Sequence, residues 1–173
     1  SVTKVLFPLL KRIGLLWLTG NVIPAQEHYA SALIIKKMLV AIDGLEKPTN
    51  NVGRKVLLFT PVGELHEIPL LFMHYMLKKN GVPQIYLGKN VSLEMLDLVC
   101  KQQSVNQLYF HVITNLTRCD IKEYLCRLSR LFPDKEIVFS GSQVCQCEGA
   151  PANVRRLMCN EEMLQFTRLQ QFA

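Results

Sequence analysis

The sequence has no long apolar run and no leader-like beginning. No stretch approaches the roughly 18 consecutive apolar residues that a membrane-spanning helix requires. The first residues lack the charged, apolar and small-residue blocks of a secretory signal peptide. We therefore expect a soluble, cytoplasmic protein with no membrane partner. Because the sequence does not begin with methionine, we also expect it to be a piece of a longer protein.

Motifs of common enzyme classes are also missing. The sequence contains no GxxxxGK(S/T) phosphate loop, no GxGxxG after its first predicted strand, no GxSxG nucleophile motif and no HExxH zinc motif. Nucleotide hydrolysis, dinucleotide chemistry, esterase chemistry and zinc proteolysis therefore lack their defining parts. No nucleophile with a neighbouring base can be assembled from the other motifs, so we expect that the chain is not an enzyme.

Cysteine and positive charge are present but dispersed. Six cysteines in 173 residues, 49% of which are hydrophobic, fit reduced thiols better than a disulfide scaffold. Cys145 and Cys147 form one short pair without a second pair or a nearby histidine, which argues against a zinc site. The net charge of +6 is spread over basic pairs: Lys36-Lys37, Lys78-Lys79 and Arg155-Arg156. Nucleic-acid binding requires one basic patch, so we expect these pairs at solvated helix ends.

Apolar patterns beyond residue 54 alternate between strand and helix periods. Short apolar runs bounded by turn residues predict strands, and helical spacing predicts helices. The predicted strands are 55–60, 83–87, 107–112, 136–140 and 154–158, and the predicted helices are 67–80, 92–103, 118–132 and a last one from 160. This alternation predicts an α/β fold, with a parallel sheet covered by helices on both faces.

The segment before residue 54 has a different pattern. Its apolar residues keep helical spacing over residues 1–45, and the pair Gly20-Asn21 predicts two helices rather than one. The stretch 43–54, DGLEKPTNNVGR, concentrates glycine, proline and asparagine. We therefore place a domain boundary there, with a helical domain at 1–50 and an α/β domain at 54–173.

The turn after the first predicted strand carries two ionisable side chains. Pro61 and Gly63 end the strand, and Glu64 and His66 precede the helix. Ligands of open parallel α/β sheets bind in the crevice outside the carboxyl ends of the strands. Glu64 and His66 are therefore candidates for ligand contact, and the alternative is a turn histidine that only caps the following helix. His111, at the end of the third predicted strand, has no partner that the sequence reveals.

Two stretches carry a family resemblance. In WLTGNVIPAQEHYAS, Trp17 is followed ten residues later by Glu27 and then His28, and the run PVGELHEIPLLFMHYMLKKNGVPQIYLGKNV follows the first predicted strand. Over nearly its whole length the chain resembles the CarH-like cobalamin-sensing regulators of the MerR family. The resemblance implies a flavodoxin-like (Rossmann-like) parallel five-stranded sheet of strand order 2-1-3-4-5. A small helical cap, part of a four-helix bundle, would precede this cobalamin-binding-type domain.

The resemblance assigns roles to individual residues. His66 would be the lower axial ligand of the cobalt, and Glu64 would be the acceptor that orients its ring. The upper face of the corrin would be capped by Trp17, Glu27 and His28. The groove for the nucleotide tail would be lined by Thr114, Gly141 and Ser142. We expect the missing side chain of Gly141 to let the ligand approach the backbone closely.

Three positions depart from the family pattern. Pro69 stands where the motif has glycine, and Ser142 replaces the second of two glycines, so both narrow the groove for the tail. Leu18 stands where photosensing relatives have a histidine that binds cobalt after light exposure, so we do not expect that light response. The alternative for the cap residues is a buried packing tryptophan beside an exposed polar pair.

The resemblance implies an effector-sensing domain of a MerR-type transcription factor that binds cobalamin, as adenosylcobalamin or a related corrinoid. The partners would be further copies of the chain, in a homodimer or tetramer, and DNA through an N-terminal domain absent from this sequence. Two alternatives stay open. One is a degenerate module that no longer binds cobalamin and serves oligomerisation or another ligand. The other is the corrinoid-carrying subunit of a methyltransferase.

Overall fold

The structure is a computed structural model that describes residues 24–46, 53–114, 120–147 and 149–168. The described elements alternate as the sequence predicts. In chain order they are α2 (Pro24–Asp43), β1 (Val56–Pro61), α3 (Ile68–Lys79), β2 (Gln84–Val91), α4 (Leu93–Gln102), β3 (Gln107–His111), α5 (Ile121–Leu131), β4 (Glu136–Ser140), the 3-10 helix η1 (Ser142–Gln146), β5 (Val154–Leu157) and α6 (Asn160–Phe166). The first predicted helix, with Trp17 and Leu18, lies outside the described residues.

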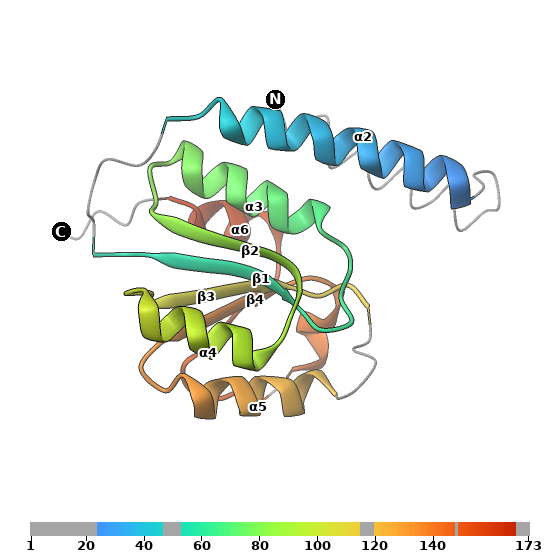
Figure 1. Cartoon of the computed structure of the whole chain (residues 1–173). Helices are drawn as coiled ribbons and strands as arrows, with labels where there is room; N and C mark the ends of the chain where they lie inside the picture. Colours follow the sequence, from blue (N-terminus) through green and yellow to red (C-terminus); the bar gives the residue numbers. More distant parts are fainter. Residues whose placement is uncertain (1–23, 47–52, 115–119, 148, 169–173) are drawn as a thin grey trace.

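The described strands form one parallel five-stranded sheet in the order β2-β1-β3-β4-β5. Helices α3 and α6 cover one face of this sheet, α4 and α5 cover the other, and α2 lies on the outer side of α3 (Figure 1). The predicted α/β class and the strand order 2-1-3-4-5 are both confirmed. The strand order reverses between β1 and β3, and open α/β sheets bind their ligands outside the carboxyl ends of the strands at such a point.

The core fixes the positions of the central strands. In β1, alternate side chains enter different apolar clusters, with Leu57 and Phe59 facing α4 and α5 and Leu58 facing α3. All three are fully buried, which is typical of a parallel strand covered on both faces. The ring of Phe110 in β3 stacks on that of Phe139 in β4, with centroids 5.3 Å apart. The carboxyl ends of β1, β3 and β4 therefore have a rigid support.

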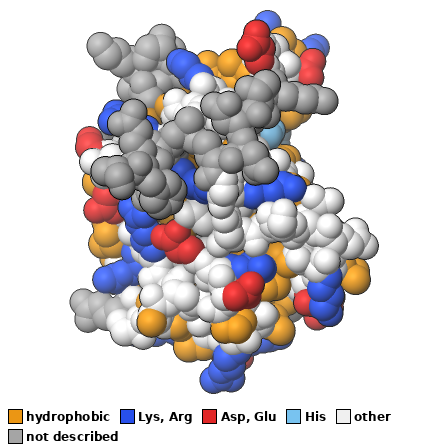
Figure 2. Space-filling view, turned by 90° about the vertical axis from the view of Figure 1, so that its left-hand side faces the viewer, with side chains coloured by type: hydrophobic (Ala, Val, Ile, Leu, Met, Phe, Trp, Pro, Cys, Tyr) orange, Lys and Arg blue, Asp and Glu red, His pale blue; other side chains and the backbone are white. Residues whose placement is uncertain are grey.

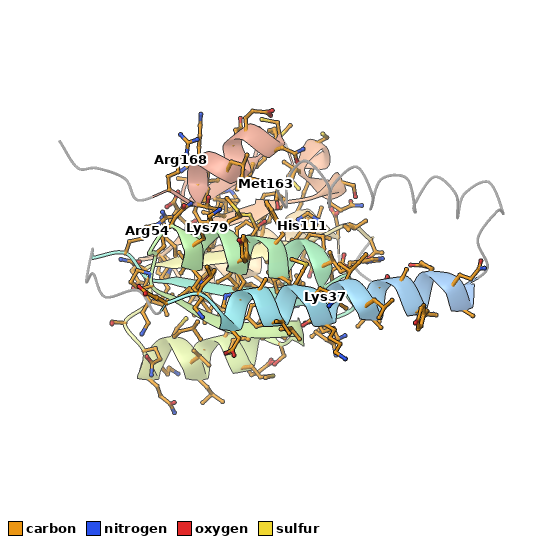
Figure 3. The ribbon with its side chains drawn as sticks, turned by 90° about the horizontal axis from the view of Figure 1, so that it is seen from above. Lys37, Arg54, Lys79, His111, Met163 and Arg168 are labelled. Carbon is orange, nitrogen blue, oxygen red and sulfur yellow. The ribbon has the colours of Figure 1, made fainter. Side chains whose placement is uncertain are left out.

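Helix α2 contacts the rest of the molecule through only part of its length. Met38 and Ile42 are buried against α3 in the C-terminal half of α2. The N-terminal part of α2 extends beyond α3, past the carboxyl edge of the sheet (Figures 1 and 3). Tyr29 and Leu33 in that part are exposed by 68% and 45%. The extension therefore offers apolar surface beside the candidate ligand edge.

Basic side chains gather at the opposite, amino edge of the sheet (Figure 2). Lys78 Nζ donates a hydrogen bond of 2.7 Å to the Ile42 carbonyl at the end of α2. Arg54 donates to the carbonyl oxygens of Phe166 and Arg168 at the end of α6, at 2.6 and 2.9 Å. Positive charge at a helix C-terminus offsets the partial negative charge of the last carbonyls. Part of the net positive charge thus serves the fold.

The basic pairs do not all lie where we expected them. Lys78 and Lys79 occupy the last turn of α3, as predicted for solvated helix ends. The other two pairs lie elsewhere, since Lys36-Lys37 is inside α2 and Arg155-Arg156 is inside β5. None of the helices in the described parts of the chain is long and apolar enough to cross a membrane.

Strand β2 is longer than the predicted strand 83–87 and is irregular. Its pairing with β1 shifts register between Leu58 and Phe59 and again between Phe59 and Pro61. Gly88 and Asn90 have φ values of 83° and 60°, and such left-handed residues accompany bulges. These shifts bend the end of β2 toward the loop that carries Glu64 and His66.

Candidate functional site

The loop between β1 and α3 turns sharply at the carboxyl edge of the sheet. Gly63 adopts a φ of 94°, and the amide of Glu64 donates to the Pro61 carbonyl at 3.0 Å. Pro69 occupies the first turn of α3, where no backbone N–H is needed. The turn directs the Glu64 side chain inward, where it is fully buried, while the His66 side chain stays 50% exposed.

A hydrogen-bonded carboxylate-imidazole pair results, which we call the Glu64–His66 dyad. His66 Nδ1 lies 2.6 Å from Glu64 Oε1, and the His66 amide donates to the same oxygen at 2.9 Å. The other oxygen, Oε2, accepts from the amides of Ile113 and Thr114 at 2.7 and 3.0 Å and from Thr114 Oγ1 at 3.1 Å. One buried carboxylate thus joins the loop after β1 to the segment after β3.

The surroundings of the dyad favour a negative charge on Glu64 and a positive charge on His66. Burial alone would raise the pKa of Glu64, but hydrogen bonds from His66, Thr114 and Ile113 outweigh it and lower that pKa to about 2. The hydrogen bond to Glu64 raises the pKa of His66, against the opposing effect of burial. The charges of Glu64 and Glu27 add to the rise. Glu64 is therefore ionised near neutral pH.

The dyad orients a single imidazole nitrogen toward the edge of the molecule. With Nδ1 held by the carboxylate, Nε2 is the ring atom that remains for a metal. In a metal-binding histidine, the ring nitrogen that does not bind the metal is commonly hydrogen-bonded to a carboxylate. Within the described ranges, no group of three or more His, Cys, Asp and Glu side chains converges to hold a metal ion.

Exposed apolar side chains lie near the dyad in the sequence of both loops. Val62 precedes the dyad and Leu65 lies between its two members, and they are exposed by 38% and 63%. Ile113, in the segment after β3, is exposed by 38%. Glu27, at the N-terminal end of α2, lies close enough for its charge to act on His66. The loops beside the dyad thus carry exposed apolar side chains, and one acidic residue from α2 lies nearby.

A second polar network lies beside the dyad, within the face of the sheet that α3 and α6 cover. Ser140 Oγ is 2.7 Å from His111 Nδ1 and 2.6 Å from Tyr109 OH, and all three residues are buried. Burial lowers the pKa of His111 to about 4, against the charge of Glu64. His111 lies toward the carboxyl edge, away from Arg54 and Arg168 (Figure 3). His111 is therefore a neutral partner of Ser140 at neutral pH.

The structure brings together most of the residues predicted for the site. Glu64, His66 and Thr114 form one hydrogen-bonded group. Glu27 lies near this group, and His28 is an exposed residue of the same helix turn. Gly141 and Ser142 follow β4, next to the segment after β3. Whether any of them contacts a ligand stays a prediction, and Trp17 is outside the described residues.

Gly141 is explained by the fold itself. We expected its missing side chain to make room for a ligand, but a Cβ there would lie 2.0 Å from the Val112 carbonyl oxygen, and its φ is 115°. The backbone of the segment after β3 therefore occupies this space. Ser142 Oγ donates to the Ile113 carbonyl at 2.6 Å, so its hydroxyl also ties these loops together.

Two features of the site were missed by sequence reasoning. Ser140 was not recognised as the partner of His111, although the two are paired in register as the last residues of adjacent strands. Aligning the predicted strand ends would have indicated this contact. Thr60 and Asn90, which hold the loop of the dyad, gave no signal, because their contacts depend on the bulge in β2.

Comparisons with known proteins agree with this geometry at the level of the fold. No protein-family model and no curated protein matches the chain. Among solved structures, the chain is similar to the monomethylamine corrinoid protein of Methanosarcina barkeri, with a TM-score of 0.76, 20% identity, and 95% of this chain and 80% of that chain covered. A cobalamin-binding protein from Desulfitobacterium hafniense DCB-2 gives a TM-score of 0.43 and 18% identity, with 90% and 66% covered.

The first of these likenesses shows that the chain shares its Rossmann-like fold with a corrinoid protein. It supports the part of the sequence resemblance that concerns this fold. It does not support the expected link to MerR regulators, because the similar structure is a corrinoid protein.

Proposed function

We propose that the chain is a corrinoid-binding domain in which His66 Nε2 would hold the cobalt. The observation that carries this proposal is the Glu64–His66 dyad at the switch point of the sheet. Its buried carboxylate holds Nδ1 at 2.6 Å and leaves Nε2 at the edge. One imidazole suffices for a metal whose other ligands belong to a macrocycle.

The residues present fit a corrinoid. Neutral imidazole is a good ligand for cobalt, and the exposed apolar side chains of Val62, Leu65 and Ile113 suit the apolar surface of a corrin ring. In this proposal Glu27, whose charge acts on His66, and its neighbour His28 would contact the bound corrinoid. A bound corrinoid would supply a cobalt ion able to accept and release an alkyl group. The chain's own part would be to bind, orient and shield it.

We favour the role of a corrinoid carrier in methyl transfer over that of a regulator. The support is the likeness to a monomethylamine corrinoid protein over 95% of this chain. In this role the chain presents its cofactor to partner enzymes and catalyses no bond-making step alone. The partners are then the enzymes that load and unload the methyl group.

A sensor role is the second candidate, and the position of Glu27 favours it. Its charge acts on His66, so a group bound above the corrin would meet α2. A change in that upper group would then move α2 and alter a homodimer or tetramer, which would transmit the signal to a DNA-binding domain. This candidate keeps the resemblance of the Glu27-His28 pair to the cap of the regulators.

The test of cobalamin binding is a visible absorption titration of the chain with hydroxocobalamin and methylcobalamin, followed by removal of free ligand. We expect retained corrinoid in the wild type, and a lost or altered spectrum with His66→Ala. His74→Ala is the matched control, because His74 lies in α3, outside the Glu64–His66 dyad, and stacks on Tyr86 of β2, with ring centroids 4.7 Å apart. Equal spectra for wild type and His66→Ala would overturn the ligand assignment. No retention by the wild type would favour the degenerate module.

Two further measurements separate carrier from sensor. A carrier exchanges a methyl group with a methyltransferase partner, which the spectrum of the bound corrinoid reports. A sensor changes its oligomeric state when adenosylcobalamin replaces hydroxocobalamin, which light scattering after size-exclusion chromatography reports. An adenosyl-dependent change of mass would favour the regulator over the carrier.

A further inference from the structure

The bulged end of β2 holds the loop that carries the dyad. Two register shifts insert extra residues into β2 opposite Phe59 and Pro61 of β1. Asn90, in the second shift, is the non-glycine residue with positive φ among those the structure describes, at 60°. Such a backbone conformation is costly for most residues and is best tolerated by asparagine and aspartate. The strained position therefore needs a compensating contact.

Asn90 makes that contact to the loop. Its side-chain Oδ1 accepts a hydrogen bond of 3.0 Å from the Gly63 amide, one residue before Glu64. Its own amide donates to Thr60 Oγ1 at 3.0 Å, and Thr60 Oγ1 donates to the Glu64 carbonyl at 2.6 Å. A continuous chain of hydrogen bonds thus runs from β2 to the backbone of the dyad.

The same strand also holds the far end of the loop. Tyr86 OH donates to Glu67 Oε1 at 2.9 Å, and Lys89 Nζ lies 3.3 Å from Glu67 Oε2. Glu67 directly follows His66, so β2 contacts the loop on both sides of the dyad. The Asn90 contact differs from these, because the Asn90 side chain accepts from the backbone amide of Gly63 and therefore restricts the conformation of the turn.

We infer that Asn90 is a positioning residue that sets the direction of His66 Nε2 through Gly63, Thr60 and the backbone of Glu64. This inference rests on the proposed role of His66 as a metal ligand. Asn90 touches no ligand in this role. It fixes the turn, the turn fixes the carboxylate of Glu64, and the carboxylate fixes the imidazole.

Two variants separate the side-chain contact from the backbone conformation. Asn90→Gly adopts positive φ freely but has no acceptor for the Gly63 amide. Asn90→Asp keeps an acceptor and tolerates the same φ. The Asn90–Gly63 hydrogen bond is exposed. Ser129→Ala is the control, because it removes a more buried side-chain hydrogen bond, 2.6 Å long, to Asn153, remote from the dyad.

The readout is nitrogen-resolved NMR of the His66 ring in corrinoid-free protein. In the wild type and Asn90→Asp we expect His66 to hold its proton on Nδ1, against Glu64 Oε1. In Asn90→Gly we expect a mixture of the two tautomers. Corrinoid retention by Asn90→Gly should weaken by about tenfold. Ser129→Ala should change only the Tm.

Failure of this inference differs from failure of the proposed function. If Asn90→Gly loses stability but keeps the wild-type tautomer of His66, Asn90 is only structural and the inference is overturned. If instead the wild type retains no corrinoid while Asn90→Gly still shifts the His66 tautomer, the positioning role stands and the corrinoid proposal fails. Should Asn90→Gly not fold, the Gly63 amide provides the test: its temperature coefficient must indicate a hydrogen bond in the wild type and Asn90→Asp.

Discussion

At the scale of single residues, Glu64 makes more of the hydrogen bonds that hold the site together than its place in a short motif suggests. Its carboxylate is fully buried and accepts hydrogen bonds from His66, Ile113 and Thr114. A buried carboxylate with donors on both oxygens is stable only as long as it stays ionised and those donors stay in place. The same group thus fixes two loops and one imidazole.

Glu64→Gln removes the charge of this side chain and keeps its size. It therefore tests how Glu64 holds the two loops and the imidazole, apart from its packing. The amide nitrogen of glutamine would face backbone donors, so we expect a loss of roughly 2–4 kcal/mol in the free energy of unfolding. Without the negative charge, the pKa of His66 should fall toward its ordinary value, which NMR titration measures. A Gln variant with an unchanged His66 pKa would contradict the dyad geometry. Glu67→Gln is the control, since Glu67 contacts Tyr86 and not His66.

His111 should make stability depend on pH. Its pKa is about 4 in the folded chain and 6.5 in the unfolded chain, so the unfolded state binds more protons between these values. The stabilisation is complete above pH 6.5 and is lost as the pH falls toward 4, by on the order of 3 kcal/mol. Urea denaturation from pH 7 to pH 4.5 measures the slope, and His111→Phe should flatten it. An equal slope in both proteins would show that another group titrates there.

At the scale of elements, the connections after β3 and β4 depend on one glycine. Gly141→Ala would drive a Cβ into the Val112 carbonyl at 2.0 Å, at a φ that alanine avoids. We expect a loss of roughly 3 kcal/mol or more, measured by thermal unfolding. Gly149→Ala is the matched control, because its φ is 77° but nothing lies within 4 Å of the added Cβ. Its loss should stay near 1 kcal/mol. Similar losses for both would contradict the close approach.

The elements differ in how far the sequence predicts them. Apolar runs and helical spacing give the order of elements, and the rule of right-handed crossovers leaves few topologies for them. Glu64 and His66 stand out because strand ends in such sheets bind ligands. The hydrogen bonds to Glu64 from Ile113 and Thr114 join segments about fifty residues apart, and no local pattern encodes them. The same holds for Asn90, whose role depends on a bulge.

At the scale of the whole molecule, Arg54 connects the start of the α/β part to its end. It donates to the carbonyls of Phe166 and Arg168, and its guanidinium lies 4.5 Å from the centre of the Phe166 ring. These contacts hold α6 on the sheet face that also contains Tyr109. The amino edge thus closes the fold, on the side of the sheet opposite to the Glu64–His66 dyad.

Arg54→Ala should therefore destabilise the whole molecule. We expect a loss of roughly 2–3 kcal/mol in urea denaturation, because two carbonyls at a helix end lose a charged donor. Arg54→Lys should recover part of it, since lysine keeps the charge but not the fork of donors. Arg155→Ala is the control: its ion pair with Glu136 is exposed and 3.7 Å long, and its loss should cost at most about 0.5 kcal/mol. A comparable loss of stability from Arg155→Ala would contradict the larger contribution that we assign to Arg54.

The bulge sits in β2, an edge strand of the described sheet, whereas the buried strands β1, β3 and β4 carry the aromatic core. Within this strand Val91 belongs to the apolar core and Gly88 has a positive φ, whereas Lys89 and Asn90 are exposed. Substitutions at these two exposed positions can therefore alter the turn before His66 while the core keeps its packing. For protein engineering, a library randomised over residues 89 and 90 should yield mostly folded variants that differ in how they present one imidazole.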